Sequence, residues 1–131
     1  MNNTRESVKT FKSLSYTQNI KKGEIYFADL DEGFGSEQGG SRPVIVIQNN
    51  IGNKYSPTVI VSTITSRDKK PLPTHVYVDS STSGLMKNST ITLEQIKTLD
   101  KTRLKQRIGK IDNMKQVDKA IMVSFGINIP S

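Results

Sequence analysis

Short apolar stretches separated by polar, turn-forming residues run along the chain from residue 23 onward. Stretches of this length that are β-branched, or that alternate apolar with polar residues, are typical of β-strands. The stretch at 43–48 is almost continuously apolar, as expected of a central strand that is buried on both faces. The pattern predicts strands over residues 24–30, 43–48, 58–65, 74–78, 90–96 and 106–111.

A helical pattern is present near the C-terminus. One face of this predicted helix carries Met114, Val117, Ile121, Ser124 and Phe125. Their spacing is close to the 3.6-residue period of an α-helix. Asp112 is placed to cap the N-terminus of the helix, and Gly126 is placed to cap its C-terminus.

Polar segments separate these elements. Residues 31–41 include four glycines and predict a flexible loop, and residues 50–53 predict a turn. Asp100 is placed to cap a short turn that runs to Leu104. Residues 1–20 are rich in Ser, Thr, Asn and Lys, which predicts a poorly ordered arm or a short helix outside the main core. Together these elements predict a small, curved, mostly antiparallel sheet or barrel with one closing helix.

Composition narrows the classes of site that the chain can carry. Its 131 residues are enough for one domain. It has no cysteine and a single histidine, which excludes disulfides, thiolate metal sites, a cysteine nucleophile and a two-histidine acid–base pair. The sequence has no apolar run of membrane-spanning length and no secretory signal pattern, so we expect a cytoplasmic protein.

The net charge of +7 favours a polyanionic partner such as nucleic acid. The basic excess lies in residues 1–22 and 97–131, whereas residues 23–96 carry more acidic than basic residues. A second interpretation is that the basic residues near the C-terminal end simply keep an exposed surface solvated. Those residues are Lys101, Arg103, Lys105, Arg107 and Lys110.

One arginine and one threonine stand out because of their predicted positions. If strands 43–48 and 58–65 form a hairpin closed between Asn50 and Pro57, pairing position by position places Arg42 opposite Thr65. Arg42 precedes a proline, which restricts its backbone. A guanidinium beside a hydroxyl suits a phosphate group. The alternative is that the arginine is structural and the threonine serves only β-propensity.

His75 begins a strand and has no second histidine or cysteine with which to share a metal. A half-buried or base-stacking role is favoured over a catalytic one. Glu94 and Gln95 lie near the end of an alternating strand, where they either read base edges or face solvent. The glycine-rich segment 35–43 is not a P-loop, because Gly-Lys-Ser/Thr is absent and a strand follows it.

Several segments of the chain resemble the MazF/PemK family of toxin endoribonucleases, most closely the branch found in Gram-positive bacteria. The resemblance extends over about residues 21–126, and its opening glycine-rich block is highly specific. The matching segments include Gly23–Leu30, Gly35–Val44, Gln48–Asn53, Leu72–Val76, Leu93–Ile96 and Asp100–Leu104.

The resemblance implies a toxin domain over residues 21–131, folded as a small SH3-like β-barrel with short helices and a C-terminal α-helix. It also implies a symmetric homodimer that cleaves single-stranded mRNA at short sequences, without metal or cofactor. The 2′-hydroxyl of the RNA would attack to leave a 2′,3′-cyclic phosphate and a 5′-hydroxyl. An acidic antitoxin of the MazE type would inhibit the activity.

The resemblance also implies roles for individual residues. Arg42 and Thr65 match the catalytic residues of the family, the same pair that the hairpin geometry brings together. Glu37 and Arg42 are the open candidates for proton transfer. The residues that match the active-site loop and the RNA groove are Ser36, Glu37, Gln38, Asn49, Ser66, His75, Glu94 and Gln95.

Two alternatives of different class remain beside the nuclease. One is a non-catalytic SH3-like barrel that binds nucleic acid, and the other is a gyrase poison of the CcdB type built on the same fold. The presence of both Arg42 and Thr65 argues against these alternatives, since neither function needs a guanidinium paired with a hydroxyl.

Overall fold

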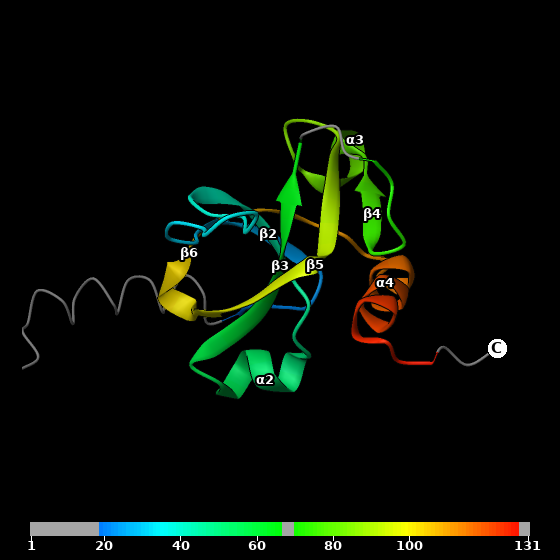
Figure 1. The fold of residues 1–131 in the computed structure, drawn as a ribbon. Helices are drawn as coiled ribbons and strands as arrows, with labels where there is room; N and C mark the ends of the chain where they lie inside the picture. The colour runs from blue at the N-terminus through cyan, green and yellow to red at the C-terminus, as the bar shows by residue number, and fades with distance from the viewer. Residues whose placement is uncertain (1–18, 67–69, 129–131) are drawn as a thin grey trace, which may run out of the picture.

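The computed structural model describes residues 19–66 and 70–128. Within them, six strands form one antiparallel sheet in the order β4-β5-β3-β2-β1-β6 (Figure 1). The strands are β1 (Glu24–Asp29), β2 (Ser41–Val46), β3 (Thr58–Thr65), β4 (His75–Val78), β5 (Ser89–Asp100) and β6 (Leu104–Lys110). The helices are α2 (Asn50–Tyr55), α3 (Ser80–Ser83), the 3₁₀ turn η1 (Lys101–Arg103) and α4 (Lys115–Phe125). The mainly-β prediction is confirmed, as is each predicted strand.

Strand β2 lies inside the sheet and is buried on both faces, as its apolar run predicts. Val44 and Val46 belong to one buried cluster, and Ile45 belongs to another. Since side chains of a strand alternate between faces, the two clusters lie on opposite sides of β2. Helix α4 packs against β4 and β5 and covers one of these clusters, whose members include Val117 and Ala120 (Figure 1).

Strand β5 contains an irregularity that allows it to contribute side chains to both buried clusters. Its pairing with β3 is regular up to Ser62 opposite Ile96, but the next residue of β3, Thr63, pairs with Thr92. Residues 93–95 are therefore extra residues in β5. An odd number of extra residues reverses the face on which later side chains lie. Accordingly, Leu93 belongs to one cluster and Leu99, six positions later, to the other.

The gap between the edge strands β4 and β6 is bridged by a close backbone contact at the end of α3. No hydrogen-bonded ladder joins these two strands within the described residues. Gly84 and Gly109 instead approach so closely that a Cβ on Gly109 would overlap the carbonyl oxygen of Ser83. A Cβ on Gly84 would lie 2.6 Å from the carbonyl oxygen of Ile108. The sheet is thus barrel-like, without a closed ring of ladders.

The predicted turn at residues 50–53 is wrong, because these residues begin α2. The side chain of Asn49 accepts a hydrogen bond from the Gly52 backbone N–H at 2.8 Å and caps the helix. Asn53 is fully buried and donates to the carbonyl oxygen of Gln48 at 2.9 Å. Capping and burial therefore stabilise a helix in a segment whose composition is that of a turn.

One of the basic residues assigned by sequence to an exposed surface is buried. Lys101 is 6% exposed, and its ammonium group donates to the carbonyl oxygen of Asn53 at 2.5 Å. Lys101 thereby joins η1 to the C-terminal end of α2. Asp100 caps η1 by accepting from the Thr102 backbone N–H at 2.9 Å, which confirms the predicted short turn.

The C-terminal helix is confirmed, but it begins later than predicted. Asp112 does not cap it. Instead, α4 starts at Lys115, whose backbone N–H donates a hydrogen bond to the side-chain oxygen Oδ1 of Asn113 at 3.1 Å. Gly126 ends the helix in the left-handed conformation, as predicted. Phe125, assigned to the apolar face by its spacing, is 62% exposed.

The predicted N-terminal arm lies mostly outside the described residues. Ile20, which the sequence places in that arm, is 2% exposed and belongs to the same buried cluster as Val44. The packed domain therefore includes this residue. Among residues 19–66 and 70–128, no helix is long and apolar enough to cross a membrane.

Candidate active site

Arg42 is the second residue of β2, at the point where the loop between β1 and β2 (residues 30–40) enters the sheet. It pairs with Ala28 of β1. Its Nε donates a hydrogen bond to the carbonyl oxygen of Gly39 at 3.0 Å. The last residues of the loop therefore fix the direction in which the guanidinium extends.

Thr65 is the last residue of β3 and is 4% exposed. The observed pairing of β2 with β3 joins Val44 to Thr63 and Val46 to Val61, in the predicted register. Two positions further along, this register sets Arg42 opposite Thr65, although the paired residues themselves end at Val44 and Thr63. Side-chain alternation puts the two predicted catalytic residues on one face of the sheet.

The loop between β1 and β2 is folded closely on itself, although its glycines predict flexibility. A Cβ on Gly39 would overlap the backbone nitrogen of Gly33, so the two glycines permit a contact that other residues would block. The Glu37 carboxylate accepts from the Phe34 backbone N–H at 3.0 Å, and the Glu37 backbone N–H donates to the carbonyl oxygen of Phe34 at 3.1 Å. These contacts favour a defined loop conformation.

Gln95 attaches this loop to the irregular part of β5. Its Oε1 accepts from the backbone N–H of Gln38 at 3.2 Å, and its Nε2 donates to the carbonyl oxygen of Ser36 at 3.2 Å. The structure thus brings three of the predicted site residues together. Because the contacts of Gln95 are to backbone groups, its side chain holds the loop in this conformation.

Glu94, the neighbour of Gln95, accepts hydrogen bonds from His75, the first residue of β4, and from Thr74, which directly precedes β4. Its two carboxylate oxygens accept from the Thr74 hydroxyl at 2.8 Å and from Nε2 of His75 at 3.0 Å. Burial raises the pKa of Glu94, but the hydrogen bonds from His75 and Thr74 outweigh this effect and hold the pKa below its ordinary value of 4.5. An ionised Glu94 requires the proton of a neutral His75 to sit on Nε2.

Thr74 is a member of this cluster that sequence reasoning missed. The signal was its position directly before His75, since both side chains reach the same carboxylate. The His75 side chain is 7% exposed, and its Nδ1 is buried without a partner among the described residues.

The structure does not bring Asn49 to this cluster. Asn49 lies beyond the end of β2 that is opposite to Arg42, and its side chain is engaged as the cap of α2. Ser66 directly follows Thr65 and lines a cavity of about 580 Å³. Within residues 19–66 and 70–128, no three acidic or histidine side chains gather where they could hold a metal ion.

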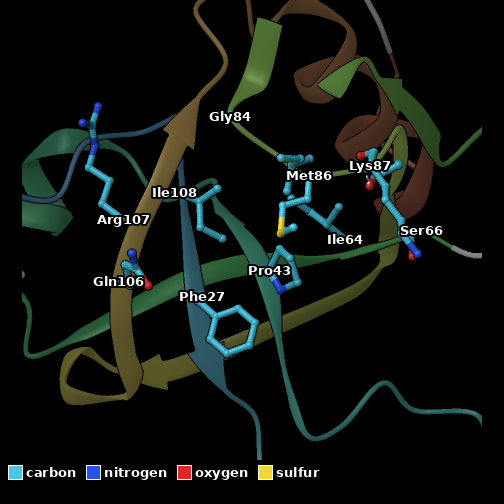
Figure 2. Close-up of a pocket in the computed structure, with 12 residues that line it drawn as sticks. Phe27, Pro43, Ile64, Ser66, Gly84, Met86, Lys87, Gln106, Arg107 and Ile108 are labelled. Carbon is cyan, nitrogen blue, oxygen red and sulfur yellow. Dashed lines mark hydrogen bonds between the residues drawn. The ribbon is translucent and has the colours of Figure 1, made fainter. Parts of the chain in front are cut away.

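The cavity lies on the other face of the sheet from Arg42 and Thr65. Figure 2 shows Phe27, Pro43 and Ile108 around it, with Met86 of the segment after α3 extending over the opening. Pro43 and Ile64 line it, and each is next to a predicted catalytic residue in a strand whose side chains alternate. Arg42 and Thr65 therefore face away from this cavity, whereas Ser66, another predicted site residue, lines it.

Comparison with known proteins identifies relatives along most of the chain. Residues 21–125 match the family model described as the PemK-like, MazF-like toxin of type II toxin–antitoxin systems. Endoribonuclease MazF of Staphylococcus saprophyticus is 52% identical over 112 residues, which are 83% of this chain and 93% of that protein. Endoribonuclease EndoA of Bacillus subtilis is 50% identical over 111 residues, which are 82% of this chain and 96% of that protein.

A solved structure shares the fold. An endoribonuclease from a mycobacterial species, in complex with its cognate antitoxin, superimposes with a TM-score of 0.72 at 23% identity, covering 85% of this chain and 99% of that one. The shared fold, the match to the family model and the sequence identity to both relatives lead to the same assignment. The chain belongs to the family of PemK-like, MazF-like toxins of type II toxin–antitoxin systems.

Proposed function

We propose that this protein is the toxin of a type II pair and that it cleaves single-stranded mRNA at short sequences without a metal ion. Endoribonuclease activity follows from the family and from the names of the two relatives. The observation that carries the proposed chemistry is the position of Arg42 and Thr65, on one face of adjacent strands beside a loop that directs the arginine.

In the proposed reaction, the 2′-hydroxyl oxygen attacks the adjacent phosphorus in line with the bond to the 5′ oxygen. The new P–O bond closes a 2′,3′-cyclic phosphate as the bond to the 5′ oxygen breaks. A proton leaves the 2′-hydroxyl, and the 5′ oxygen gains one. The Arg42 guanidinium stabilises the negative charge that develops on the phosphoryl oxygens, and the Thr65 hydroxyl donates a further hydrogen bond.

The proton-transfer groups are part of the proposal. Glu37 and Arg42 are both candidates for proton transfer. In the described conformation the Glu37 carboxylate accepts from the Phe34 backbone N–H, so it acts as a base only after that hydrogen bond is released. Guanidinium is a weak acid, so Arg42 serves mainly to stabilise charge.

The other predicted site residues would form the RNA groove. Ser36, Gln38 and Gln95 meet in the loop contact, while His75 and Glu94 form the adjoining pair. For Ser66 and Asn49, a role in RNA binding stays a prediction. Base edges can be read by such amide, carboxylate and imidazole groups when the RNA is single-stranded.

We also propose a homodimer and an acidic, MazE-type antitoxin. The excess of basic residues supports an acidic partner. The mycobacterial endoribonuclease of the same fold is in complex with its cognate antitoxin. Light scattering at micromolar concentration should report about twice 14.6 kDa, and a mass of about 14.6 kDa alone would contradict the dimer. Because mRNA is the substrate, the activity would take place in the cytoplasm.

Cleavage of a short single-stranded RNA in the presence of EDTA tests the proposed chemistry. We expect full activity, products that end in a 2′,3′-cyclic phosphate and a 5′-hydroxyl, and no cleavage when the scissile nucleotide is 2′-deoxy. Activity that is lost in EDTA and returns with magnesium would overturn the metal-independent mechanism. Tight RNA binding without cleavage would favour the non-catalytic barrel, and gyrase inhibition without cleavage would favour the gyrase poison.

A further inference from the structure

Arg103 of η1 binds the chain where β1 ends and the loop between β1 and β2 begins. Its Nη2 lies 2.6 Å from the carboxylate oxygen Oδ2 of Asp31, and its Nη1 donates to the carbonyl oxygen of Asp29 at 3.2 Å. A single planar guanidinium therefore holds both a side chain and the backbone at the point where β1 ends. The hydrogen bond from Arg103 also holds the pKa of Asp31 below its ordinary value of 3.8.

Asp31 is also the point at which the two ends of the loop are tied together. Its φ is +63°, a left-handed conformation that is uncommon outside glycine. Its carbonyl oxygen accepts from the Gly40 backbone N–H at 2.6 Å, and the carbonyl oxygen of Gly40 accepts from the Leu30 backbone N–H at 3.0 Å. Through these two hydrogen bonds, the position of Asp31 fixes the position of Gly40.

Gly39, the residue before Gly40, carries the carbonyl oxygen to which Nε of Arg42 donates at 3.0 Å. An unbroken series of contacts therefore leads from Arg103 through Asp31 and the end of the loop to Arg42. We propose that Arg103 is a positioning residue that keeps the guanidinium of Arg42 aimed at the scissile phosphate. This inference rests on the proposed function, in which Arg42 is catalytic.

Exposure separates this role from a role in stability. The side chains of Arg103 and Asp31 are 36% and 64% exposed, and ion pairs this exposed contribute little to the free energy of folding. Catalysis is more sensitive, because a misplacement of about 1 Å can cost about 100-fold in rate. Loss of Arg103 should therefore lower turnover and leave the thermal stability almost unchanged.

The first test compares Arg103→Met and Asp31→Gly with Lys110→Met. Glycine adopts φ +63° freely, so Asp31→Gly removes the carboxylate without backbone strain. Lys110→Met is the matched control, because it also removes one positive charge and breaks an exposed ion pair, with Asp112 at 3.3 Å. We expect kcat to fall about 10-fold or more in the first two variants, with KM unchanged, and to stay within about twofold in the control.

The double variant Arg103→Met/Asp31→Gly should lose no more than the larger single loss, since both changes break one series of contacts. Losses that multiply would overturn the proposal. So would an Arg103→Met enzyme with normal kcat, weaker RNA binding and a salt dependence reduced by about one phosphate contact, because Arg103 would then bind RNA directly.

A second measurement does not depend on cleavage. In the NMR spectrum of the wild type, the Nε–H of Arg42 and the backbone N–H of Gly40 should exchange slowly with water, because each is hydrogen-bonded. Both should exchange at least about 10-fold faster in Arg103→Met, or in Asp31→Gly if the first variant fails to fold. Unchanged exchange would overturn the positioning role, even for a protein that cleaves no RNA. A wild type without cleavage would instead contradict the proposed function.

Discussion

Nε2 of His75 lies 3.0 Å from the carboxylate oxygen Oε2 of Glu94, across the neighbouring strands β4 and β5. His75 pairs with Thr92 of β5, and Glu94 lies two residues further along that strand, so its carboxylate reaches His75 as a diagonal neighbour. Since an ionised carboxylate only accepts hydrogen bonds, the contact fixes the tautomer of a neutral His75, and its Nδ1, which has no partner among the residues that the structure describes, becomes an acceptor.

Removing the charge of Glu94 should flatten the acid dependence of stability. The pKa of Glu94 is below 4.5 in the folded protein, so its ionised form stabilises the fold above that pH and the contribution is lost as pH falls through the lowered pKa. Between about pH 6 and pH 3, Glu94→Gln should lose about 0.5 kcal/mol less unfolding free energy than the wild type. Urea unfolding at both pH values measures this. If the unfolding free energy fell by the same amount in both proteins, the Glu94 carboxylate would not be stabilised by its hydrogen-bond partners.

Arg42→Ala should slow RNA cleavage by roughly 100- to 1,000-fold, a loss of roughly 3 to 4 kcal/mol in transition-state stabilisation, by analogy with lost oxyanion donors. Single-turnover cleavage of a short RNA measures the loss, and circular dichroism checks the fold. Arg42 lies at the strand end outside the apolar clusters, so the variant should stay folded. A variant that cleaves at the wild-type rate would remove Arg42 from the mechanism.

Thr65→Val should be severely impaired, but less than Arg42→Ala, because one hydrogen-bond donor is lost and the arginine remains. Thr65 is 4% exposed, so valine, which keeps the β-branched shape, tests the hydroxyl with less disturbance than alanine. Thr65→Ser is the matched control, as it keeps a hydroxyl and should retain more activity. Equal activity in wild type and Thr65→Val would show that the hydroxyl takes no part.

Asn49→Ala should lower the free energy of unfolding by about 1 kcal/mol, because α2 loses its cap. Asn49→Asp keeps a capping oxygen and should retain most of the stability. The pair also tests the predicted RNA contact of Asn49, since a carboxylate in the groove would weaken RNA binding and a carboxylate away from it would not. Binding of a 2′-deoxy RNA analogue measures the second effect.

Gly109→Ala should destabilise the fold by roughly 1 to 3 kcal/mol, because the added Cβ overlaps the backbone of Ser83 and cannot be relieved by a rotamer change. Gly52→Ala is the control. There the three atoms nearest to the added Cβ, at 3.0 to 3.1 Å, belong to the side chain of Gln48 rather than to backbone, and alanine favours a helix. Thermal unfolding of both variants measures the difference. Similar melting temperatures would mean that the contact beside α3 does not hold the barrel together.

The proposed antitoxin should compete with RNA. An acidic, disordered segment that places a carboxylate near Arg42 would occupy the phosphate position and fold as it binds. Its affinity should fall with salt, since exposed charge pairs are screened over roughly 8 to 10 Å at physiological ionic strength. Titration against the 2′-deoxy RNA analogue measures competition. A stable ternary complex with every toxin site filled would require an allosteric mode of inhibition.

The features that the sequence predicted are those that depend on the local pattern of residues or on the number of residues in a hairpin. The register of β2 with β3, and with it the relation of Arg42 to Thr65, follows from strand lengths around one short connection. The helix α2 could not be predicted this way. Its residues are those of a turn, and it is stabilised by the burial of Asn53 and the contact from Lys101, which are tertiary.

The arrangement of the site depends on contacts between residues far apart in the sequence. Gln95 and Ser36 are separated by 59 positions, and Arg103 and Asp29 by 74. No local pattern indicates that these side chains hold the loop between β1 and β2. The glycines of that loop predicted flexibility because composition does not reveal whether a glycine serves a free turn or, as at Gly33 and Gly39, a close backbone contact.

The three extra residues of β5 also set a rule for deletions. Because the reversal of faces needs an odd number of extra residues, a chain shortened by two at 93–95 would keep Leu99 in its own cluster, with a one-residue bulge in place of three. A chain shortened by one would turn Leu99 toward the wrong face. Related sequences that align here with gaps should therefore differ in length by two residues rather than one.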